Sequence, residues 1–579
     1  MFLGSAVSGD LPDGLKGERK MKRKIRSLLL AAVLVAAAVL PGLASTMNAI
    51  PPWPEGAIYG VVSLERPDAF LQRTVNSLLV RTAMSHLPEA QFATQWLSKF
   101  PVNSLSLAVG YGEKGFSLQG AARFNEGKKA LLAKLAEGKG EEGDLDALLD
   151  SPMPGMLLLA PMDGGTYGVI QNGTAMVLIS VESDMLLMGF SPEDIAAARE
   201  ALKDPQKRMK IDRKLAQDNF FYFHDNGMAA ENIRNASKGA LPEPQALLAA
   251  ELAFGLTQKG FDLSLLSNFS KVFPAPEGSP AAAPLSGDQK LLLGGGKPWF
   301  SAVLQLALDK RHFQGVRDAA QAGDENAAQV VKLLEDIKQF GLDEDAILSI
   351  LKTMGVVLGS QTSAFGSPLP GGYVYVSGKK ESVELLLPIL EMAAREAGIP
   401  FESKSAPGWT ALYSLKDPVE AFMGIRGGSV LAGLVSEGAL GSAPELGPGM
   451  KSLFGDSGVY SFLYLDGGVL RSTAMGLLNP DGPWAPFVAK DEMAGSIPAI
   501  IEGMKASAEI EAIDIRVSSA ERLDFAVRTA EAKKAELDAM NALAAKWRQK
   551  LQKAPQVQQK GQTVQPSPQP KPRPKPAKP

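Results

Sequence analysis

A 20-residue segment that occurs twice is the feature of this sequence that most constrains its fold. Leu105–Phe124 reads LSLAVGYGEKGFSLQGAARF, and Ala250–Phe269 reads AELAFGLTQKGFDLSLLSNF. Aligned without a gap, the two copies agree at eight positions, whereas chance gives about one or two for a chain of this composition. The shared positions are Leu107/Leu252, Ala108/Ala253, Gly110/Gly255, Lys114/Lys259, Gly115/Gly260, Phe116/Phe261, Leu118/Leu263 and Phe124/Phe269.

Each copy has the pattern of a β-hairpin. In the first copy, Leu105, Leu107, Val109 and Tyr111 alternate with other residues, which is the period of two that is typical of a half-buried strand. Gly112–Gly115 predicts the turn, because glycine adopts positive φ without steric cost. The second copy predicts a hairpin in the same way.

A third hairpin is predicted around a turn at Ser518–Glu521. One side of its strands carries apolar residues: Ile513, Ile515, Val517, Leu523, Phe525 and Val527. The other side carries charged residues: Asp514, Arg516, Asp524 and Arg528. We expect the apolar side to be buried and the charged side to face water, as in an antiparallel sheet that helices cover on one side.

These patterns predict an α+β fold of tandem repeated modules, each an antiparallel sheet with helices packed mainly on one face. A chain of 579 residues is too long for a single core. The predicted elements form a long unit and then a short unit, and this order occurs twice, so we expect an internal duplication. The predicted segments are a first module pair at 51–273, a linker at 274–297, and a second module pair at 298–553 that ends in a helix.

The N-terminal region predicts export from the cytoplasm. Met21–Arg26 is basic, Leu28–Leu40 is an apolar run, and Gly42 and Ala44 are small residues at the positions that a signal peptidase requires. Residues 21–44 therefore have the pattern of a Sec-type signal peptide, and residues 1–20 that of an upstream mis-start. An uncleaved membrane anchor is the alternative, although the apolar run is short for a span. We expect the mature protein in the periplasm or at the cell surface, with no transmembrane span after cleavage.

Composition excludes several classes of function. The chain has no cysteine, which excludes disulfides, thiolate catalysis and cysteine-ligated metals. Its 60 basic residues nearly balance its 63 acidic residues, and this argues against a nucleic-acid-binding protein.

The C-terminal residues 554–579 alternate proline with polar or basic residues. This composition predicts a disordered tail that favours polyproline II, since it cannot form a core. A solvated tail is the simplest interpretation. The other is a basic spacer that contacts an anionic envelope polymer or lipid headgroups.

Three short motifs have the composition of catalytic or phosphate-binding sites. Gly455–Gly458 contains Ser457 in the pattern of a serine-protease nucleophile, for which His86, His224 or His312 would have to supply the base. Gly294–Lys297 lacks the first glycine and the Ser or Thr of a phosphate loop. Ser377–Lys380 gives a Ser/Lys pair without its companion motifs. We interpret the first as a turn, the second as a linker end, and the third as a spacing that is common by chance.

Acidic residues near the predicted opening strands form a recurrent pattern. Asp225, Asp309 and Asp466 each follow a strand and precede a helix, and Asp68 lies close behind the first strand. Helix capping explains this position better than metal binding, which requires oxygen ligands gathered in one loop. His224 beside Asp225 could form an acid–base or ligand pair, but a hydrogen-bonded structural pair is the simpler explanation.

The sequence therefore predicts no catalytic, cofactor-binding or metal-binding residue and no cofactor. We expect a non-enzymatic extracytoplasmic binding or scaffold protein of the bacterial envelope. The alternative is a secreted hydrolase whose active site lies at a module interface.

Overall fold

The computed structural model describes the chain between residues 46 and 553. Within this range it leaves out residues 54–55, 78–80, 82–98, 113–114, 152–157, 172–173, 216, 218, 238–240, 258–259, 276–282, 288, 290–291, 293–297, 307, 365–366, 397–399, 436–453, 455–457 and 489–491. The predicted signal peptide and the predicted tail lie outside the described residues.

The described residues up to Val272, which we call the first half, form ten strands, and the strands and helices of the second half follow from Phe300 onward. The strands of the first half are β1 Ile58–Glu65, β2 Val102–Gly112, β3 Gly115–Phe124, β4 Leu158–Met162, β5 Thr166–Gln171, β6 Thr174–Glu182, β7 Met185–Gly189, β8 Asn219–His224, β9 Ala249–Thr257 and β10 Gly260–Ser267. Its helices are η1 Thr46–Ala49, α2 Pro67–Asn76, η2 Glu126–Lys128, α5 Lys129–Ala136, α6 Asp144–Leu149, α7 Pro192–Lys203, η3 Pro205–Lys207, α8 Met228–Ala236 and α9 Phe269–Val272.

The second half also contributes ten strands. They are β11 Phe300–Gln305, β12 Thr353–Ala364, β13 Ser367–Ser377, β14 Glu402–Lys404, β15 Trp409–Leu415, β16 Ala421–Arg426, β17 Ser429–Leu434, β18 Ser461–Asp466, β19 Ile510–Ser519 and β20 Arg522–Thr529. The helices are α11 Lys310–Gln321, α12 Glu325–Lys338, α13 Glu344–Ile350, α14 Lys380–Glu384, α15 Leu387–Glu396, α18 Gly467–Leu477, α19 Ala485–Val488, α20 Glu492–Ala506 and α21 Lys534–Lys553.

All three predicted hairpins are confirmed. β2 pairs with β3, β9 with β10, and β19 with β20. The turn falls at the same position of the repeated segment in both copies, because Gly115 begins β3 and Gly260 begins β10. Both glycines have positive φ, as the predicted turns require.

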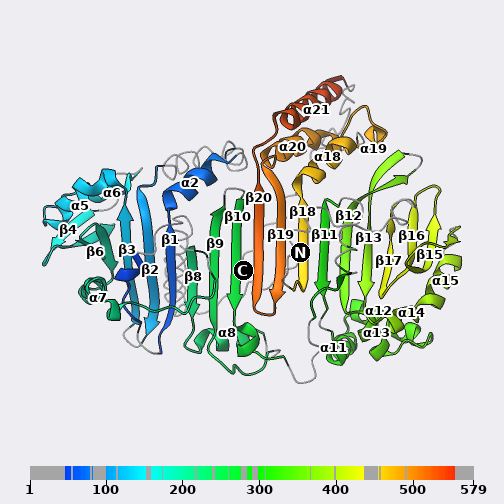
Figure 1. Cartoon of the computed structure of the whole chain (residues 1–579), viewed down its shortest axis with the longest axis horizontal. Coiled ribbons are helices and arrows are strands. Elements are labelled where there is room, and N and C mark those ends of the chain that lie inside the picture. Colours follow the sequence, from blue (N-terminus) through cyan, green and yellow to red (C-terminus); the bar gives the residue numbers. More distant parts are fainter. Residues whose placement is uncertain are drawn as a thin grey trace, which may run out of the picture.

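The strands form one 20-stranded sheet, and every pairing in it is antiparallel (Figure 1). The order across the sheet is β4-β5-β6-β7-β3-β2-β1-β8-β9-β10-β20-β19-β18-β11-β12-β13-β17-β16-β15-β14. The predicted mixed fold with a large antiparallel sheet is therefore confirmed. β4 and β14 form the two outer edges of the sheet.

The two halves of the chain meet at the pairing of β10 with β20. From this junction outward, the first half follows the order β10, β9, β8, β1, β2, β3, β7, β6, β5, β4. The second half follows the corresponding order β20, β19, β18, β11, β12, β13, β17, β16, β15, β14. Each strand of one half thus has the neighbours that its counterpart has in the other.

Helices lie on both faces of the sheet near its β4 edge. Adjacent strand residues point to opposite faces, and Leu178 and Ile179 of β6 belong to different clusters. Ile179 packs in the cluster that contains Leu132 of α5, and Leu178 packs in the cluster that contains Ile195 of α7. The prediction of helices mainly on one face is not confirmed at this end of the sheet.

A second large cluster occupies the other half of the sheet. It includes Val357 of β12, Tyr375 of β13 and Phe462 of β18. Leu285 and Leu292, which fall in the segment predicted as a linker, are buried in the same cluster. This part of the predicted linker therefore contributes to a core.

Candidate functional site

The central strands of the sheet present an apolar side that is not buried. Cross-strand partners point to the same side, and the pairs Leu263–Phe525, Phe525–Ile515 and Ile515–Leu463 connect β10, β20, β19 and β18. Further pairs continue this side through β11, β12 and β13. We call it the open apolar face; its residues are Phe261, Leu263, Leu265, Leu523, Phe525, Val527, Ile513, Ile515, Val517, Leu463, Leu465, Phe300, Ala302, Leu304, Met354, Val356, Leu358 and Val374.

Every residue of the open apolar face is half-buried or exposed. Leu304 and Val374 are each 53% exposed, and Met354 is 42% exposed. In Figure 1 the described helices lie beyond the ends of β10, β20, β19 and β18 and do not cross these strands. The most exposed part is the group Leu304, Met354 and Val374, together with Leu265, whereas Phe261 and Leu263 pack against the first core cluster. Exposed apolar side chains that lie next to one another often mark a binding surface.

The opposite side of the same strands is buried and partly charged, which corrects the prediction for the third hairpin. Asp514 is fully buried and Asp524 is 8% exposed, although both belong to the side that we expected to face water. The apolar residues Ile515 and Phe525, which we expected to be buried, are only half-buried. The alternation of apolar and charged residues correctly predicted which residues share a side of the hairpin. It could not show which of the two sides the rest of the chain covers.

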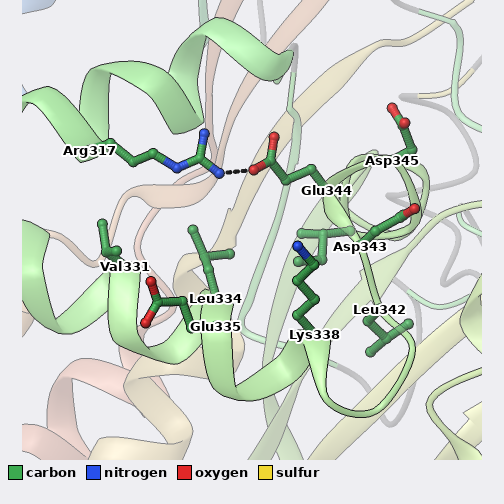
Figure 2. Close-up of a pocket in the computed structure, with 10 residues that line it drawn as sticks. Arg317, Val331, Leu334, Glu335, Lys338, Leu342, Asp343, Glu344 and Asp345 are labelled. Atoms are coloured by element: carbon green, nitrogen blue, oxygen red, sulfur yellow. Dashed lines mark hydrogen bonds and ion pairs between the residues drawn. The ribbon is translucent and has the colours of Figure 1, made fainter.

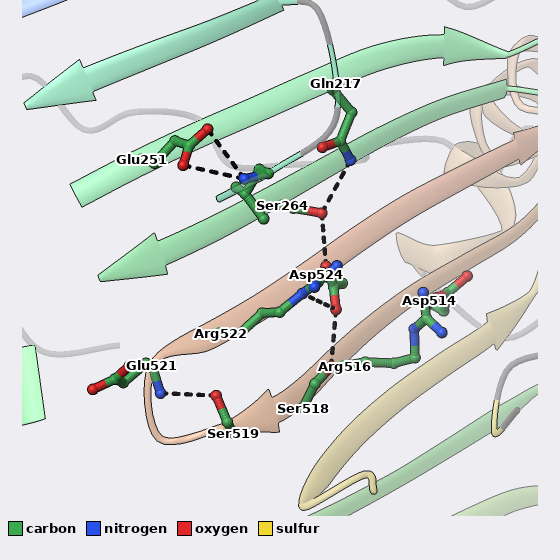
Figure 3. A network of polar contacts seen from close by, with 11 residues as sticks. Gln217, Glu251, Ser264, Asp514, Arg516, Ser518, Ser519, Glu521, Arg522 and Asp524 are labelled. Carbon is green, nitrogen blue, oxygen red and sulfur yellow. Dashed lines mark hydrogen bonds and ion pairs between the residues drawn. The ribbon is translucent and has the colours of Figure 1, made fainter. Parts of the chain in front are cut away.

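A polar network makes the burial of Asp524 possible (Figure 3). Ser264 donates a hydrogen bond of 2.7 Å to the Asp524 carboxylate, and Ser518 donates one of 2.9 Å. Arg522 Nε lies 3.1 Å from the same carboxylate. Burial by itself raises the pKa of Asp524, but the hydrogen bonds from Ser264 and Ser518 and the charge of Arg522 outweigh it and hold the pKa below its usual value.

For Asp514, burial has a larger effect on the pKa than the neighbouring charges have. Arg516 Nε and an Arg528 guanidinium nitrogen each lie 3.3 Å from its carboxylate. Desolvation by burial nevertheless dominates, and the two cations offset it only in part, so the pKa of Asp514 lies above its usual value. These carboxylates are held by structural contacts and do not face the open apolar face.

A cavity of about 300 Å³ lies among α11, α12 and α13 (Figure 2). Its lining combines apolar residues with charges of both signs: Arg317, Val331, Leu334, Glu335, Lys338, Leu342, Asp343, Glu344, Asp345 and Ile347. Arg317 forms an ion pair with Glu344, and the Asp343 carboxylate accepts the backbone N–H of Ala346 at 2.8 Å. Sequence patterns gave no indication of this cavity, because its walls come from three separate helices.

The pair His224–Asp225 has a structural role. Asp225 is fully buried, and its carboxylate accepts the backbone N–H groups of Ala229 at 2.8 Å and Ala230 at 2.9 Å at the start of α8. The His224 ring lies against Tyr59, with 5.2 Å between ring centroids. Each side chain therefore has a contact that explains its place in the fold.

Helix capping also explains Asp309 and Asp466, but the capping prediction for Asp68 is wrong. Asp309 caps α11, accepting the Arg311 backbone N–H at 2.9 Å, and Asp466 caps α18 through the Val469 backbone N–H at 2.8 Å. Asp68 instead pairs with Arg66 at 3.1 Å in the first turn of α2. Within the described part of the chain, no group of three or more His, Asp or Glu side chains could hold a metal ion.

The remaining sequence motifs form no active site in the part of the chain that the structure describes. Ser377 is buried, and its hydroxyl lies 2.6 Å from that of Ser429, whereas Lys380 lies 3.9 Å from Glu384. His86, Ser457 and Gly294–Lys297 lie outside the described residues.

Two further findings bear on function. Among the helices that the structure describes, none is long and apolar enough to cross a membrane. Comparison of the chain with protein-family models, with curated proteins and with solved structures finds no match. The function must therefore be argued from the surface of the protein itself.

Proposed function

We propose that this protein is a non-enzymatic binding protein that acts outside the cytoplasm and holds an apolar ligand on its open apolar face. The observation that carries this proposal is the contrast between the two sides of the central strands. One side, with Asp514 and Tyr375, is buried, while the apolar side, with Leu304 and Val374, is left open. The buried side already supplies an apolar core, with Val357, Tyr375 and Phe462, so the exposed apolar residues on the other side are in excess of what that core needs.

The dimensions of the open apolar face suit a hydrocarbon chain. At about 4.8 Å between neighbouring strands, the seven strands from β10 to β13 extend over roughly 29 Å. A bilayer core about 30 Å thick contains two layers of chains, so one acyl chain is roughly 15 Å long. Each methylene group that leaves water for an apolar surface contributes about 0.8 kcal/mol. The acyl chains of envelope lipids are therefore ligands of the right chemistry, and the face is long enough to hold one along its width.

An internal duplication accounts for the width of the face. The matching strand order of the two halves supports the proposal that the chain contains two copies of a ten-stranded module, joined where β10 pairs with β20. In both copies, helices pack on the apolar side: α5 beside Ile179, and α13 beside Val376. In this proposal helices cover mainly one side of the sheet at its outer parts, with α7 as an exception. The middle of that side, which is the open apolar face, is left for the ligand.

The envelope location rests on the signal peptide pattern of residues 21–44. The basic residues of the segment 554–579 fit a contact with anionic envelope polymers or lipid headgroups, which would hold the protein near its source of ligand. For the alternative of a secreted hydrolase, the polar groups at the β10–β20 junction offer no support. Ser264 there bonds to Asp524 and Gln217, and no histidine takes part in the described contacts.

Binding of an apolar fluorescent dye such as bis-ANS tests the proposal. Leu304→Glu and Leu265→Glu place charges on the open apolar face at positions that are 53% and 36% exposed, so the fold should tolerate them. Leu247→Glu, at a leucine that is 48% exposed outside the face, is the matched control. We expect the double variant to bind the dye at least tenfold more weakly than the wild type and the control. Equal binding by all three proteins would refute the proposal.

A further inference from the structure

The cavity among α11, α12 and α13 adjoins the open apolar face. Leu342 and Ile347, which line the cavity, pack in the same cluster as Val376 of β13. Val376 is the cross-strand partner of Met354, a residue of the open apolar face. A ligand chain lying over Met354 would therefore end beside the cluster that forms one wall of the cavity.

Helix α12 adds apolar surface beside the cavity. None of its residues is buried. Val330 is 43% exposed, Leu333 is 56% exposed, and Phe340, just beyond the helix, is 48% exposed. Val330 and Leu333 are three residues apart and so lie on one side of the helix. This apolar surface of α12 neighbours the lining of the cavity but is not part of it.

Charged groups of both signs line the cavity. Three of its acids are already engaged: Glu344 by Arg317, Asp345 by Lys310 at 2.8 Å, and Asp343 by the α13 backbone. Glu335 and Lys338, by contrast, have no ion-pair partner within the described ranges. Figure 2 shows the charged ends of Lys338, Arg317 and Glu344 turned toward one another.

We propose that this cavity binds the polar head of an amphiphile whose hydrocarbon chain lies on the open apolar face, and that this head is zwitterionic. The inference rests on the proposed function, since it presumes that the face holds a chain. Lys338 would pair with the anionic group of the head and Glu335 with its cationic group. Acids outnumber cations in the lining, so a purely anionic head would meet net repulsion.

The size of the cavity fits this role. Sites for small ligands have volumes of about 300–1,000 Å³, and a cavity of about 300 Å³ falls at the lower limit of that range. It is therefore large enough for a headgroup and too small for a whole lipid, which needs the adjoining face for its chain.

Calorimetric titration of the protein with three amphiphiles of equal chain length, each below its micelle concentration, tests the proposal. The three are a lysophosphatidylcholine, a fatty alcohol and a fatty acid. We expect the wild type to bind the zwitterion at least tenfold more tightly than the alcohol, since pairing with two charges strengthens binding to that extent. Lys338→Met and Glu335→Gln should each reduce this preference severalfold while leaving affinity for the alcohol unchanged.

Lys332→Met is the matched control, because Lys332 is an exposed lysine of the same helix that does not line the cavity. This variant should keep the wild-type preference. If Lys338→Met and Glu335→Gln also keep it, the head is bound elsewhere and the inference is wrong. A fatty acid that binds as tightly as the zwitterion would likewise overturn the assignment of a zwitterionic head.

The same titrations separate this inference from the proposed function. Binding of the alcohol and of bis-ANS without a preference for the zwitterion would refute the head site and leave the open apolar face as a binding surface. If the protein binds neither the alcohol nor the dye, the proposed function fails, and the inference fails with it.

Discussion

Ser264 of β10 donates a hydrogen bond of 2.7 Å to Asp524 of β20, and the two residues are 260 positions apart in the sequence. This contact links the two halves of the chain inside a buried part of the sheet. Gln217 in turn donates to the Ser264 hydroxyl at 3.3 Å, so the first half supplies a short chain of polar groups to the Asp524 carboxylate (Figure 3). Asp524 is therefore a residue at which the junction should be sensitive to substitution.

We expect Asp524→Asn to lower the free energy of unfolding by about 1–3 kcal/mol, because it removes a charge that Ser264, Ser518 and Arg522 surround. Urea denaturation monitored by circular dichroism measures this change. Asp481→Asn is the control, since Asp481 is 70% exposed and pairs only with Lys546 on the surface. Its effect should stay within about 0.5 kcal/mol. Equal effects at the two positions would contradict the structural role of Asp524.

The pH dependence of stability should distinguish Asp524 from Asp514. The pKa of Asp524 is lower in the folded than in the unfolded chain, so its ionised form stabilises the fold above about pH 4, the usual aspartate value, and this contribution disappears as pH falls further. The pKa of Asp514 is raised in the folded chain, so its contribution has the opposite sign.

Unfolding free energies measured from pH 3 to pH 7 test this contrast. As pH rises, the stability of the wild type relative to Asp524→Asn should increase up to about pH 4 and then stay level. The stability of the wild type relative to Asp514→Asn should instead decrease above about pH 4. Parallel curves for the two variants would show that the two carboxylates do not differ in this way.

The two glycines at equivalent positions of the repeated segment should respond differently to substitution. A Cβ atom at Gly260 would lie 1.9 Å from the backbone oxygen of Val527 in β20, whereas one at Gly115 would meet nothing within 4 Å. Both positions have positive φ, so alanine is strained at each. Gly115→Ala should cost about 1 kcal/mol, and Gly260→Ala should cost severalfold more, as measured by thermal unfolding. A similar cost at both sites would mean that β10 and β20 do not pair as described.

Gly355 should be intolerant of any side chain. A Cβ atom there would lie 2.2 Å from the ring of Tyr375, which packs over the glycine in the buried cluster of the second half. We expect Gly355→Ala to destabilise the protein by about 1–3 kcal/mol through overpacking. Gly315→Ala, within α11 and with nothing within 4 Å, is the control and should stabilise the protein by about 0.5–1 kcal/mol. Changes of the same sign in both variants would contradict this packing.

The hairpins could be predicted from the sequence because their information is local. Alternation in Leu105–Tyr111 and a glycine such as Gly115 specify a strand and its turn within a few residues. The helix caps at Asp309 and Asp466 were predictable for the same reason, since a cap bonds to backbone groups only two or three residues away.

The candidate site could not be predicted in the same way. The pairing of Leu263 with Phe525 joins residues from different halves, and no local pattern specifies it. Alternation around Asp514 showed that the hairpin has two different sides, but burial depends on which side the distant segments cover. The buried charge of Asp514 is tolerated only because Arg516 and Arg528 lie beside it, and this also depends on the folded arrangement.

The two outer edges of the sheet have a consequence for how the protein behaves at high concentration. Among the described strands, β4 and β14 each have a neighbour on one side only, and an outer strand is a template for a strand from another copy. β4 contains Pro161, which has no N–H to donate, and β14 consists only of Glu402–Lys404, with a charge at each end. Each edge thus ends in residues that disfavour further pairing. Growth of the sheet by edge-to-edge addition of further copies is thereby disfavoured.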